Sequence, residues 1–305
     1  MTVPVFRFAP SPNGHLHLGH AYSALLNYRS ALATGGRFLL RVEDIDTVRC
    51  TPELERDMLE DLAWLGLTWE TPVLRQSENF SAYEDALQKL ERMGLTYRAY
   101  LTRAEIKRFV AEKEAGGASW PRDPDGAPHY PGDRAVLSDE KCRQRRASDA
   151  PFAVRLDMRR ALDLVREPVT WRECSAEIPS SPAGPEWFEP NEITADPAAW
   201  GDVILARKDT PTSYHLSVVV DDAGQGVTDV MRGRDLYQAT SVHRVLQILL
   251  GLPEPRYRHH RLILDDTGRK LAKSDRSTSL RELRLAGATA MSIHERIGIW
   301  RDVKS

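Results

Sequence analysis

Short apolar runs alternate with amphipathic stretches along the first hundred residues. This periodicity predicts two strands and three helices, over 3–8, 21–28, 37–43, 52–65 and 81–93. Thr51 followed by Pro52 is typical of a helix start, and Gly94 is typical of a helix end. Strands that alternate with helices favour a parallel sheet with right-handed crossovers, in which ligands bind at the carboxyl ends of the strands.

The second half of the chain has a different pattern. Residues from about 98 to 200 are rich in turn signals and predict an insertion that ends in an irregular, extended tail near 178–200. Strands are predicted again over 202–207, 216–222 and 261–264, and the apolar run at 216–222 fits a buried parallel strand. A helix is predicted over 237–250, because Gly251 and Pro253 end its pattern.

Composition narrows the class of protein. The 305 residues are 41% hydrophobic and 28% charged, which is the balance of a globular protein of two or three domains. The sequence shows no apolar run of 18 residues and no secretory signal. The three cysteines, Cys50, Cys142 and Cys174, are widely spaced and odd in number, so they suggest neither a disulfide framework nor a zinc cluster. We therefore expect a cytoplasmic protein without membrane contact, and nothing in the sequence requires more than a monomer.

The net charge of −2 does not by itself indicate a nucleic-acid partner. Two local basic stretches, 141–146 and 256–261, are nevertheless candidates for RNA contact, and the second also carries an aromatic side chain suited to base stacking. A solvated charged face explains each stretch equally well.

Two segments carry candidate chemistry. The first, at 7–20, reads RFAPSPNGHLHLGH and lies between a predicted strand and a predicted helix. Glycines, histidines and a helix N-terminus at such a place suit phosphate binding, although a plain tight turn is the alternative. The second, Lys270-Leu271-Ala272-Lys273-Ser274, follows a predicted strand and turn. Its two lysines suit a triphosphate, although a solvated basic loop is the alternative.

Together and in this order, these segments resemble the two signatures of class I aminoacyl-tRNA synthetases. Four stretches are similar to the glutamyl branch of that family: Arg7–Gly14, Arg41–Asp46, Tyr214–Asp222 and Val230–Leu236. The resemblance implies an α/β fold with a Rossmann-like catalytic domain split by an inserted, RNA-contacting α+β domain. The expected parts are 1–97 and 201–250 for the two halves of the catalytic domain, 98–200 for the insertion, and 251–305 for the Lys-Leu-Ala-Lys-Ser loop and a C-terminal helical segment.

The resemblance also implies the roles of particular residues. Glutamate would be bound by Arg7, Ala9, Ser11, Glu43, Tyr214 and Arg232. ATP would be bound by Pro12, Gly14, His17, Gly19, His20 and Lys273, and the catalytic groups would be His17, His20, Lys270 and Lys273.

The chemistry of these side chains is consistent with the implied roles. Glu43 suits the α-ammonium group of the substrate, Arg7 and Arg232 suit its γ-carboxylate, and Tyr214 offers an orienting hydroxyl. The alternatives are local ion pairs, of Arg232 with Asp235 and of Glu43 with a neighbouring arginine.

The distance to the C-terminus distinguishes subfamilies. Only 31 residues follow Ser274, fewer than the ~50 residues of a small domain. This shape, and the run Val218–Thr228, resemble the subfamily that attaches glutamate to queuosine, the modified wobble base of tRNA(Asp). Its partners would be L-glutamate, ATP and queuosine-containing tRNA(Asp). The alternatives are a truncated enzyme that charges tRNA(Glu), a small-molecule nucleotidyltransferase and a non-catalytic RNA- or protein-binding remnant.

Metal requirements also follow from the resemblance. Many relatives hold zinc in the insertion through cysteine ligands. The matching positions here are Ala99, Leu101 and Arg134, which do not bind metal, so we predict no zinc. Tyr130, which stands at a further position of the zinc motif, is then expected to be an ordinary packing residue. Mg²⁺ would accompany the ATP phosphates.

Overall fold

The main sheet is mostly parallel and lies at the centre of the molecule. The computed structural model describes residues 3–179, 183–263 and 278–299. In the described part, the strand order of the main sheet is β3-β2-β1-β9-β10-β6-β7, and all neighbouring pairs are parallel except β6 with β7. The strands are β1 (Val5–Phe8), β2 (Arg37–Val42), β3 (Leu74–Arg75), β6 (Thr170–Glu173), β7 (Asn191–Thr194), β9 (Asp229–Gly233) and β10 (Arg256–His260).

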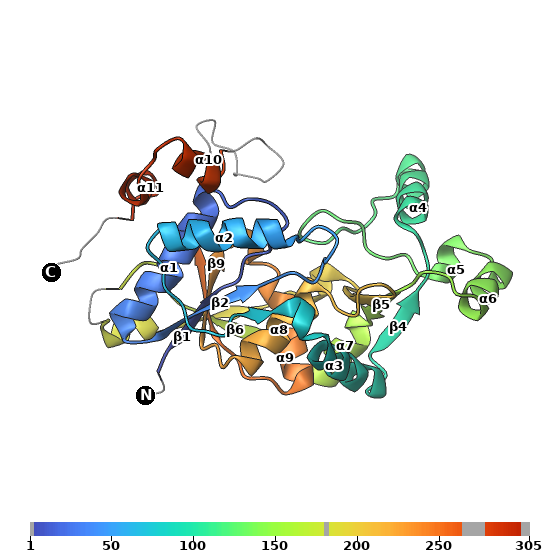
Figure 1. The fold of residues 1–305 in the computed structure, drawn as a ribbon. Coiled ribbons are helices and arrows are strands. Elements are labelled where there is room, and N and C mark those ends of the chain that lie inside the picture. The colour runs from blue at the N-terminus through green and yellow to red at the C-terminus, as the bar shows by residue number, and fades with distance from the viewer. Residues whose placement is uncertain (1–2, 180–182, 264–277, 300–305) are drawn as a thin grey trace.

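Helices cover both faces of this sheet (Figure 1). One face carries α1 (Leu18–Thr34), α2 (Pro52–Trp64), α10 (Leu280–Leu285) and α11 (Ala290–Arg296). The other face carries α3 (Phe80–Arg92), α7 (Met158–Val165), α8 (Tyr214–Gly224) and α9 (Thr240–Leu250). Each layer buries its own apolar cluster, so the fold is an α/β sandwich of the Rossmann type, as expected from the sequence.

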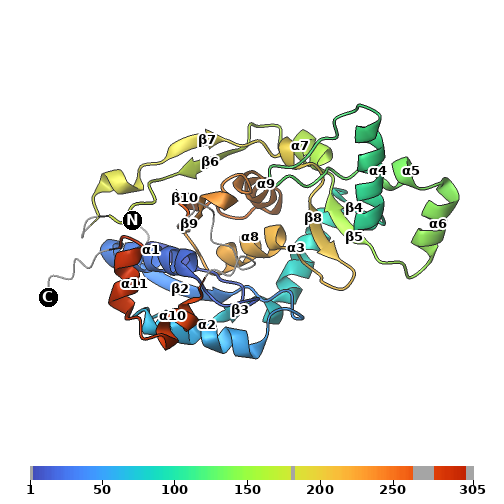
Figure 2. The ribbon, with the colours of Figure 1, turned by 90° about the horizontal axis from the view of Figure 1, so that it is seen from above.

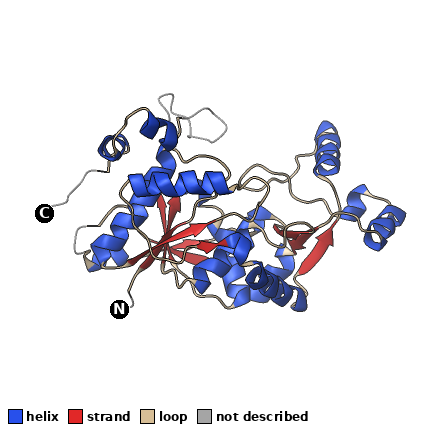
Figure 3. Ribbon diagram, viewed as in Figure 1, coloured by secondary structure: helices blue, strands red, loops and turns tan. Residues whose placement is uncertain are grey.

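A second, antiparallel sheet stands apart from the main one, as Figure 3 shows. It consists of β4 (Thr96–Ala99), β5 (Ala153–Leu156) and β8 (Ile204–Arg207), with β5 in the middle. Three helices lie at this end of the molecule: α4 (Arg103–Ala115), α5 (Asp133–Val136) and α6 (Asp139–Ala147) (Figure 2). The strand predicted at 202–207 therefore belongs here and not to the parallel sheet.

The sheets do not follow the expected division of the chain at 98 and 200. The small sheet takes β8 from beyond residue 200, whereas β6 and β7 lie between 98 and 200 but extend the main sheet. Strand β7 also lies in the segment 178–200 that was expected to be irregular. Its backbone pairs with β6 from Thr170↔Thr194 to Glu173↔Asn191, and this pairing is a long-range contact that turn signals do not encode.

Several local predictions are confirmed. Thr51 caps α2, where its side chain accepts from the backbone N–H of Leu54, and Pro52 occupies the first helical turn. Gly94 follows Met93, the C-cap of α3, and has a φ of 68°, in the left-handed region that glycine adopts at low cost.

The buried strand predicted at 216–222 is wrong, because these residues form helix α8. The helix is buried on several sides, so Leu216, Val218 and Val219 all contact apolar neighbours and no amphipathic period is visible. A short apolar run rich in valine is compatible with either a strand or a buried helix, and only its packing decided between them.

The strand predicted at 261–264 is not formed at residues 261–263, and residue 264 lies outside the described residues. The strand is instead β10, at 256–260, and lies between β9 and β6. In the basic stretch at 256–261, the candidate for RNA contact, only Arg261 is exposed. Tyr257 is 1% exposed and Arg258 is fully buried, so neither can contact RNA. Arg256 and Arg258 instead both pair with the buried Asp229, at 2.6 and 3.0 Å. In contrast, Lys141, Arg143 and Arg146 of the other basic stretch are exposed on α6.

In the described part of the chain, no helix is long and apolar enough to cross a membrane.

Candidate active site

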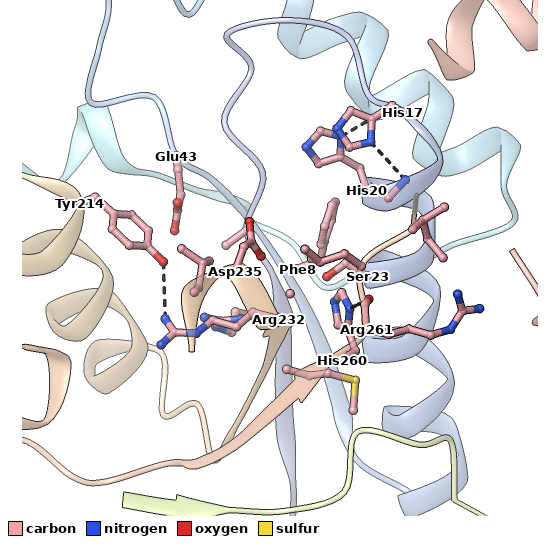
Figure 4. A pocket seen from close by; sticks show the side chains of 18 residues that line it. Phe8, His17, His20, Ser23, Glu43, Tyr214, Arg232, Asp235, His260 and Arg261 are labelled. Atoms are coloured by element: carbon pink, nitrogen blue, oxygen red, sulfur yellow. Dashed lines mark hydrogen bonds between the residues drawn. The ribbon is translucent and has the colours of Figure 1, made fainter. Parts of the chain in front are cut away.

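The candidate site lies where the winding of the main sheet reverses. Strands β1 and β9 are neighbours there, with α1 on one face of the sheet and α9 on the other. Their carboxyl ends open into a cavity of about 420 Å³, which is the place where open α/β sheets bind ligands. Eight of the residues expected at the site line it: Arg7, Ala9, His17, Gly19, His20, Glu43, Tyr214 and Arg232 (Figure 4).

Two histidines form the cap of helix α1. The ring Nδ1 of His17 accepts from the backbone N–H of Gly19 at 3.1 Å, and Nδ1 of His20 accepts from the backbone N–H of His17 at 3.1 Å. Because Nδ1 accepts in both rings, each neutral ring carries its proton on Nε2 and can donate a hydrogen bond from that atom. The site thus combines imidazole donors with the positive end of a 17-residue helix, an arrangement that favours phosphate.

Gly19 makes this histidine arrangement possible. A Cβ atom at position 19 would lie 3.0 Å from Cε1 of His17 and 3.1 Å from its Nδ1. The missing side chain therefore lets the ring of His17 lie against the first turn, 3.9 Å from the ring of His20 between centroids.

A network of buried charges supports the opposite side of the cavity. The Asp222 carboxylate accepts from Nε of Arg7 at 3.0 Å and from Nη1 of Arg41 at 2.7 Å. Nη2 of Arg41 donates to Glu43 at 3.1 Å, and its Nε lies 3.8 Å from Asp221. Three carboxylates thus face two guanidinium groups, and this excess of negative charge favours a bound ammonium group.

The pKa values in this network reflect burial and pairing. Burial raises the pKa of Glu43, although Arg41 and Arg7 oppose the increase. Burial alone would also raise the pKa of Asp222, but Arg7 and Arg41 together hold it below its usual value. Glu43 is therefore the more readily protonated of the two carboxyls, and a cationic ligand beside it would stabilise its charged form.

Arg232 faces the cavity from β9 and makes a different kind of contact. Its guanidinium donates to Tyr214 at 3.4 Å, to His243 at 3.0 Å, to His259 at 3.1 Å and to Thr240 at 2.7 Å. Among the described residues the partners of this guanidinium are two hydroxyl groups and two imidazole rings, so the alternative pairing of Arg232 with Asp235 is not observed. Glu43, in contrast, does pair with a neighbouring arginine, yet it still lines the cavity.

A second cavity of about 520 Å³ adjoins the first. Glu43 and Tyr214 line both cavities, and Ser11 lines only the second, where its hydroxyl lies 3.6 Å from Sγ of Cys50. The other walls come from the loop 123–130 and from the segment 200–215. Pro12 and Gly14 line neither cavity. Lys270 and Lys273 lie outside the described residues.

Of the positions expected to lack zinc ligands, Leu101 is hydrogen-bonded to Tyr130. Ala99 ends β4, and the hydroxyl of Tyr130 accepts from the backbone N–H of Leu101 at 3.3 Å and donates to Asp133. Arg134 is exposed beside Asp139. Tyr130 therefore does more than pack, since it links the end of β4 to α5. In the described ranges, no group of three or more histidine, cysteine or acidic side chains is placed to hold a metal.

Several residues of the site were assigned no role from the sequence. Arg41 and Asp222 lie inside stretches that carry the resemblance, so a charged residue buried in a strand or helix was the available signal. His243 and His259 have no local signal, because they reach Arg232 of β9 from α9 and β10, which only the tertiary structure brings together.

Comparisons with known proteins agree with this geometry. Residues 3–297 match the family model described as "tRNA synthetases class I (E and Q), catalytic domain". A glutamyl-Q tRNA(Asp) synthetase of Rhodobacter capsulatus is 46% identical over 97% of this chain and 100% of its own length. Another from Nocardia farcinica is 41% identical over 92% of this chain and 79% of its own length.

Longer relatives match over part of their length. A glutamate–tRNA ligase of a Synechococcus species is 35% identical over 92% of this chain, which spans about half (53%) of that relative. The crystal structure of a glutamate–tRNA synthetase from Elizabethkingia anophelis is similar at a TM-score of 0.67, with 26% identity over 94% of this chain and 54% of that one. The chain therefore belongs to the class I tRNA synthetases of the E and Q type, and it is a ligase.

Proposed function

We propose that this ligase activates L-glutamate with ATP and transfers it to the queuosine base at the wobble position of tRNA(Asp). The observation that carries the proposal is that Glu43, Arg232 and the two capping histidines, His17 and His20, line one cavity. A carboxylate, a guanidinium and a phosphate-binding helix end in one cavity suit an amino acid with an acidic side chain beside a nucleotide. The names of the relatives from Rhodobacter capsulatus and Nocardia farcinica favour queuosine as the acceptor.

Glutamate would lie between the two charged walls of the cavity. Its α-ammonium group would face Glu43, and its γ-carboxylate would accept from Arg232, with Arg7 as the second cation. The hydroxyl of Tyr214 would reorient from Arg232 towards the same carboxylate, and Ala9 and Ser11 would bound the substrate backbone. Pairing opposite charges between the ligand and the walls of the cavity supplies both affinity and orientation.

The first reaction would be nucleophilic attack of the substrate α-carboxylate on the α-phosphorus of ATP. A mixed anhydride forms, the bond to the bridging oxygen breaks, and pyrophosphate leaves. His17, His20 and the start of α1 would stabilise the charge that develops on the α-phosphate, with Pro12, Gly14 and Gly19 shaping the turn around the nucleotide. Lys270 and Lys273 would hold the β- and γ-phosphates, and Mg²⁺ would accompany them. This is catalysis by positioning and electrostatic stabilisation.

The second reaction would take place between the two cavities. A hydroxyl of the queuosine ring would attack the activated carbonyl, and AMP would leave. An acceptor in the second cavity would contact Glu43 and Tyr214, the residues that both cavities share. The second cavity is therefore the proposed entrance for the acceptor.

Transfer of radiolabelled glutamate tests the proposal directly. Purified enzyme with ATP and Mg²⁺ is given tRNA(Asp) with queuosine, tRNA(Asp) without queuosine, or tRNA(Glu). We expect label on queuosine-containing tRNA(Asp) only. Label on tRNA(Glu) instead would make the protein a charging enzyme, like the glutamate–tRNA ligases among its relatives. Chromatography with light scattering, in the same preparation, tests the expectation of a monomer, and fractionation of cells tests the expected cytoplasmic location.

Lys273 offers a test of the first reaction alone. Lys273→Ala should lower glutamate-dependent ATP–pyrophosphate exchange about 100-fold, the loss typical of one charge-stabilising group. The matched control is Lys107→Ala on the exposed face of α4, which should exchange like the wild type. Unchanged exchange in Lys273→Ala would remove this lysine from the mechanism.

A further inference from the structure

Two histidines contact the guanidinium of Arg232, and a third histidine contacts one of these two. Nη1 of Arg232 lies 3.0 Å from Nδ1 of His243, and Nε lies 3.1 Å from Nε2 of His259. His215 is one step further away, with its Nδ1 3.3 Å from Nε2 of His243. We propose that His243 and His259 are positioning residues that orient the guanidinium of Arg232 for the side-chain carboxylate of the substrate. This inference rests on the proposed role of Arg232 in binding glutamate.

The donor properties of arginine assign a tautomer to each ring. Since a guanidinium has only donors, the ring nitrogens of His243 and His259 that face Arg232 must accept. The proton of His243 is then on Nε2, directed at His215. The proton of His259 is on Nδ1, which donates to the Glu173 carboxylate at 2.9 Å. Each ring therefore accepts a hydrogen bond from Arg232 and donates one to a second group, His215 or Glu173.

Burial makes these contacts selective for the neutral rings. His243 is 1% exposed and Arg232 is 5% exposed. Burial, and then the charge of Arg232, lower the pKa of His243 well below the usual value for histidine. Burial likewise lowers the pKa of His259 to about 4, against the opposing effect of Glu173. Both rings are therefore neutral acceptors at neutral pH.

Neutral acceptors have an advantage that carboxylates lack. The guanidinium groups of Arg7 and Arg41 are paired with Asp222, so much of their charge is already compensated. His243, His259 and the hydroxyl of Thr240 fix the plane of the Arg232 guanidinium without neutralising it. The positive charge of Arg232 therefore remains available for an anionic ligand in the cavity.

Paired substitutions at position 243 test the inference. His243→Leu removes the acceptor, whereas His243→Asn places an amide oxygen where Nδ1 stood. We expect the Leu variant to raise KM for glutamate in pyrophosphate exchange at least tenfold, with KM for ATP unchanged, and the Asn variant to recover most of that loss. The control is His294→Gln, a buried histidine of α11 that hydrogen-bonds to the backbone of Leu65.

A second pair guards against a variant that does not fold. His259→Gln keeps an acceptor at the position of Nε2, and His259→Leu does not, so the same difference in KM for glutamate is expected. Thermal melting verifies that each variant is folded.

The outcomes separate the inference from the proposed function. If the wild type shows no glutamate-dependent exchange, the proposed function fails and the inference fails with it. If the wild type exchanges but the Leu and Asn or Gln variants behave alike, or KM for ATP rises as much as KM for glutamate, only the positioning role is overturned.

Discussion

The Nε atom of Arg7 lies 3.0 Å from Oδ1 of Asp222, although 215 residues separate them in the sequence. This contact joins β1, near the start of the chain, to α8, in its second half. The same carboxylate also binds Arg41 of β2, so three elements from distant parts of the chain meet at one buried charge. Without the charge of Asp222, the guanidinium groups of Arg7 and Arg41 would each lose a carboxylate partner in the protein interior.

We therefore predict that Asp222→Asn destabilises the protein by about 3–5 kcal/mol, the usual cost of removing one partner from a buried ion pair. Urea unfolding measures the loss. Asp139→Asn is the control, because Asp139 pairs with Arg134 on the surface with both side chains more than 70% exposed. Equal stability of both variants would contradict the role of Asp222.

Glu43 should contribute to affinity more than to folding. Glu43→Gln retains the shape of the side chain and loses its charge, so KM for glutamate should rise about 10- to 100-fold in pyrophosphate exchange, as expected for a hydrogen bond to a charged group. KM for ATP should remain unchanged. Glu84→Gln, on the exposed surface of α3, provides the baseline. If both KM values changed together, Glu43 would be supporting the fold of the site and not the ammonium group.

Gly19 should set the position of the His17 ring. The added methyl group of Gly19→Ala would press on that ring, and we predict about a tenfold lower rate of pyrophosphate exchange, because small displacements of catalytic groups are costly. Gly224→Ala is a matched control, since a Cβ there at the end of α8 meets no atom within 4 Å. A rate for Gly19→Ala equal to that of the control would show that the ring does not need this space.

The histidines near Arg232 should make the stability of the protein depend on pH. Burial, and then Arg232, lower the pKa of His215 from 6.5 to about 4, and His259 is lowered to about 4 as well. Between these values the unfolded chain binds protons that the native rings do not, so stability falls as the pH decreases from 6.5 towards 4. Each unit of depression corresponds to about 1.4 kcal/mol.

Urea unfolding at pH 7, 6 and 5 measures this slope. Comparison with His215→Asn isolates the contribution of one ring from that of the carboxyls, and the variant should have the shallower slope. After burial, the charges of Arg232, His215, Arg7 and His259 also lower the pKa of His243. Beyond the effect of burial, Glu173 raises the pKa of His259, and Arg232 and His260 lower it, so the protonation of each of these groups depends on the others. Parallel slopes for wild type and variant would exclude His215 from these groups.

The exposed basic residues of α6 remain candidates for RNA contact. Changing Arg143 and Arg146 to Glu should raise KM for tRNA about tenfold and weaken its dependence on salt, while pyrophosphate exchange stays constant. Arg56→Glu on α2 is the control for a general charge effect. If α6 and α2 variants transfer glutamate equally well, the patch is only a solvated face.

Local sequence alone determined the parts of the fold that short-range physics controls. The apolar periods and caps predicted β1, β2, α2 and α3, because periodicity and capping act over a few residues. The stretch 7–20 likewise identified the strand, turn and helix that place His17, Gly19 and His20 at the cavity.

Only the tertiary structure decided what depends on partners far along the chain. Burial on several sides made 216–222 a helix, and the two neighbours of β10 buried the basic stretch at 256–260. The same packing separated the two candidate guanidinium groups, since Asp222 binds Arg7 while neutral histidines hold Arg232. A sequence pattern lists the charges, but the low dielectric of the interior and the choice of neighbours determine which of them remains available to a ligand.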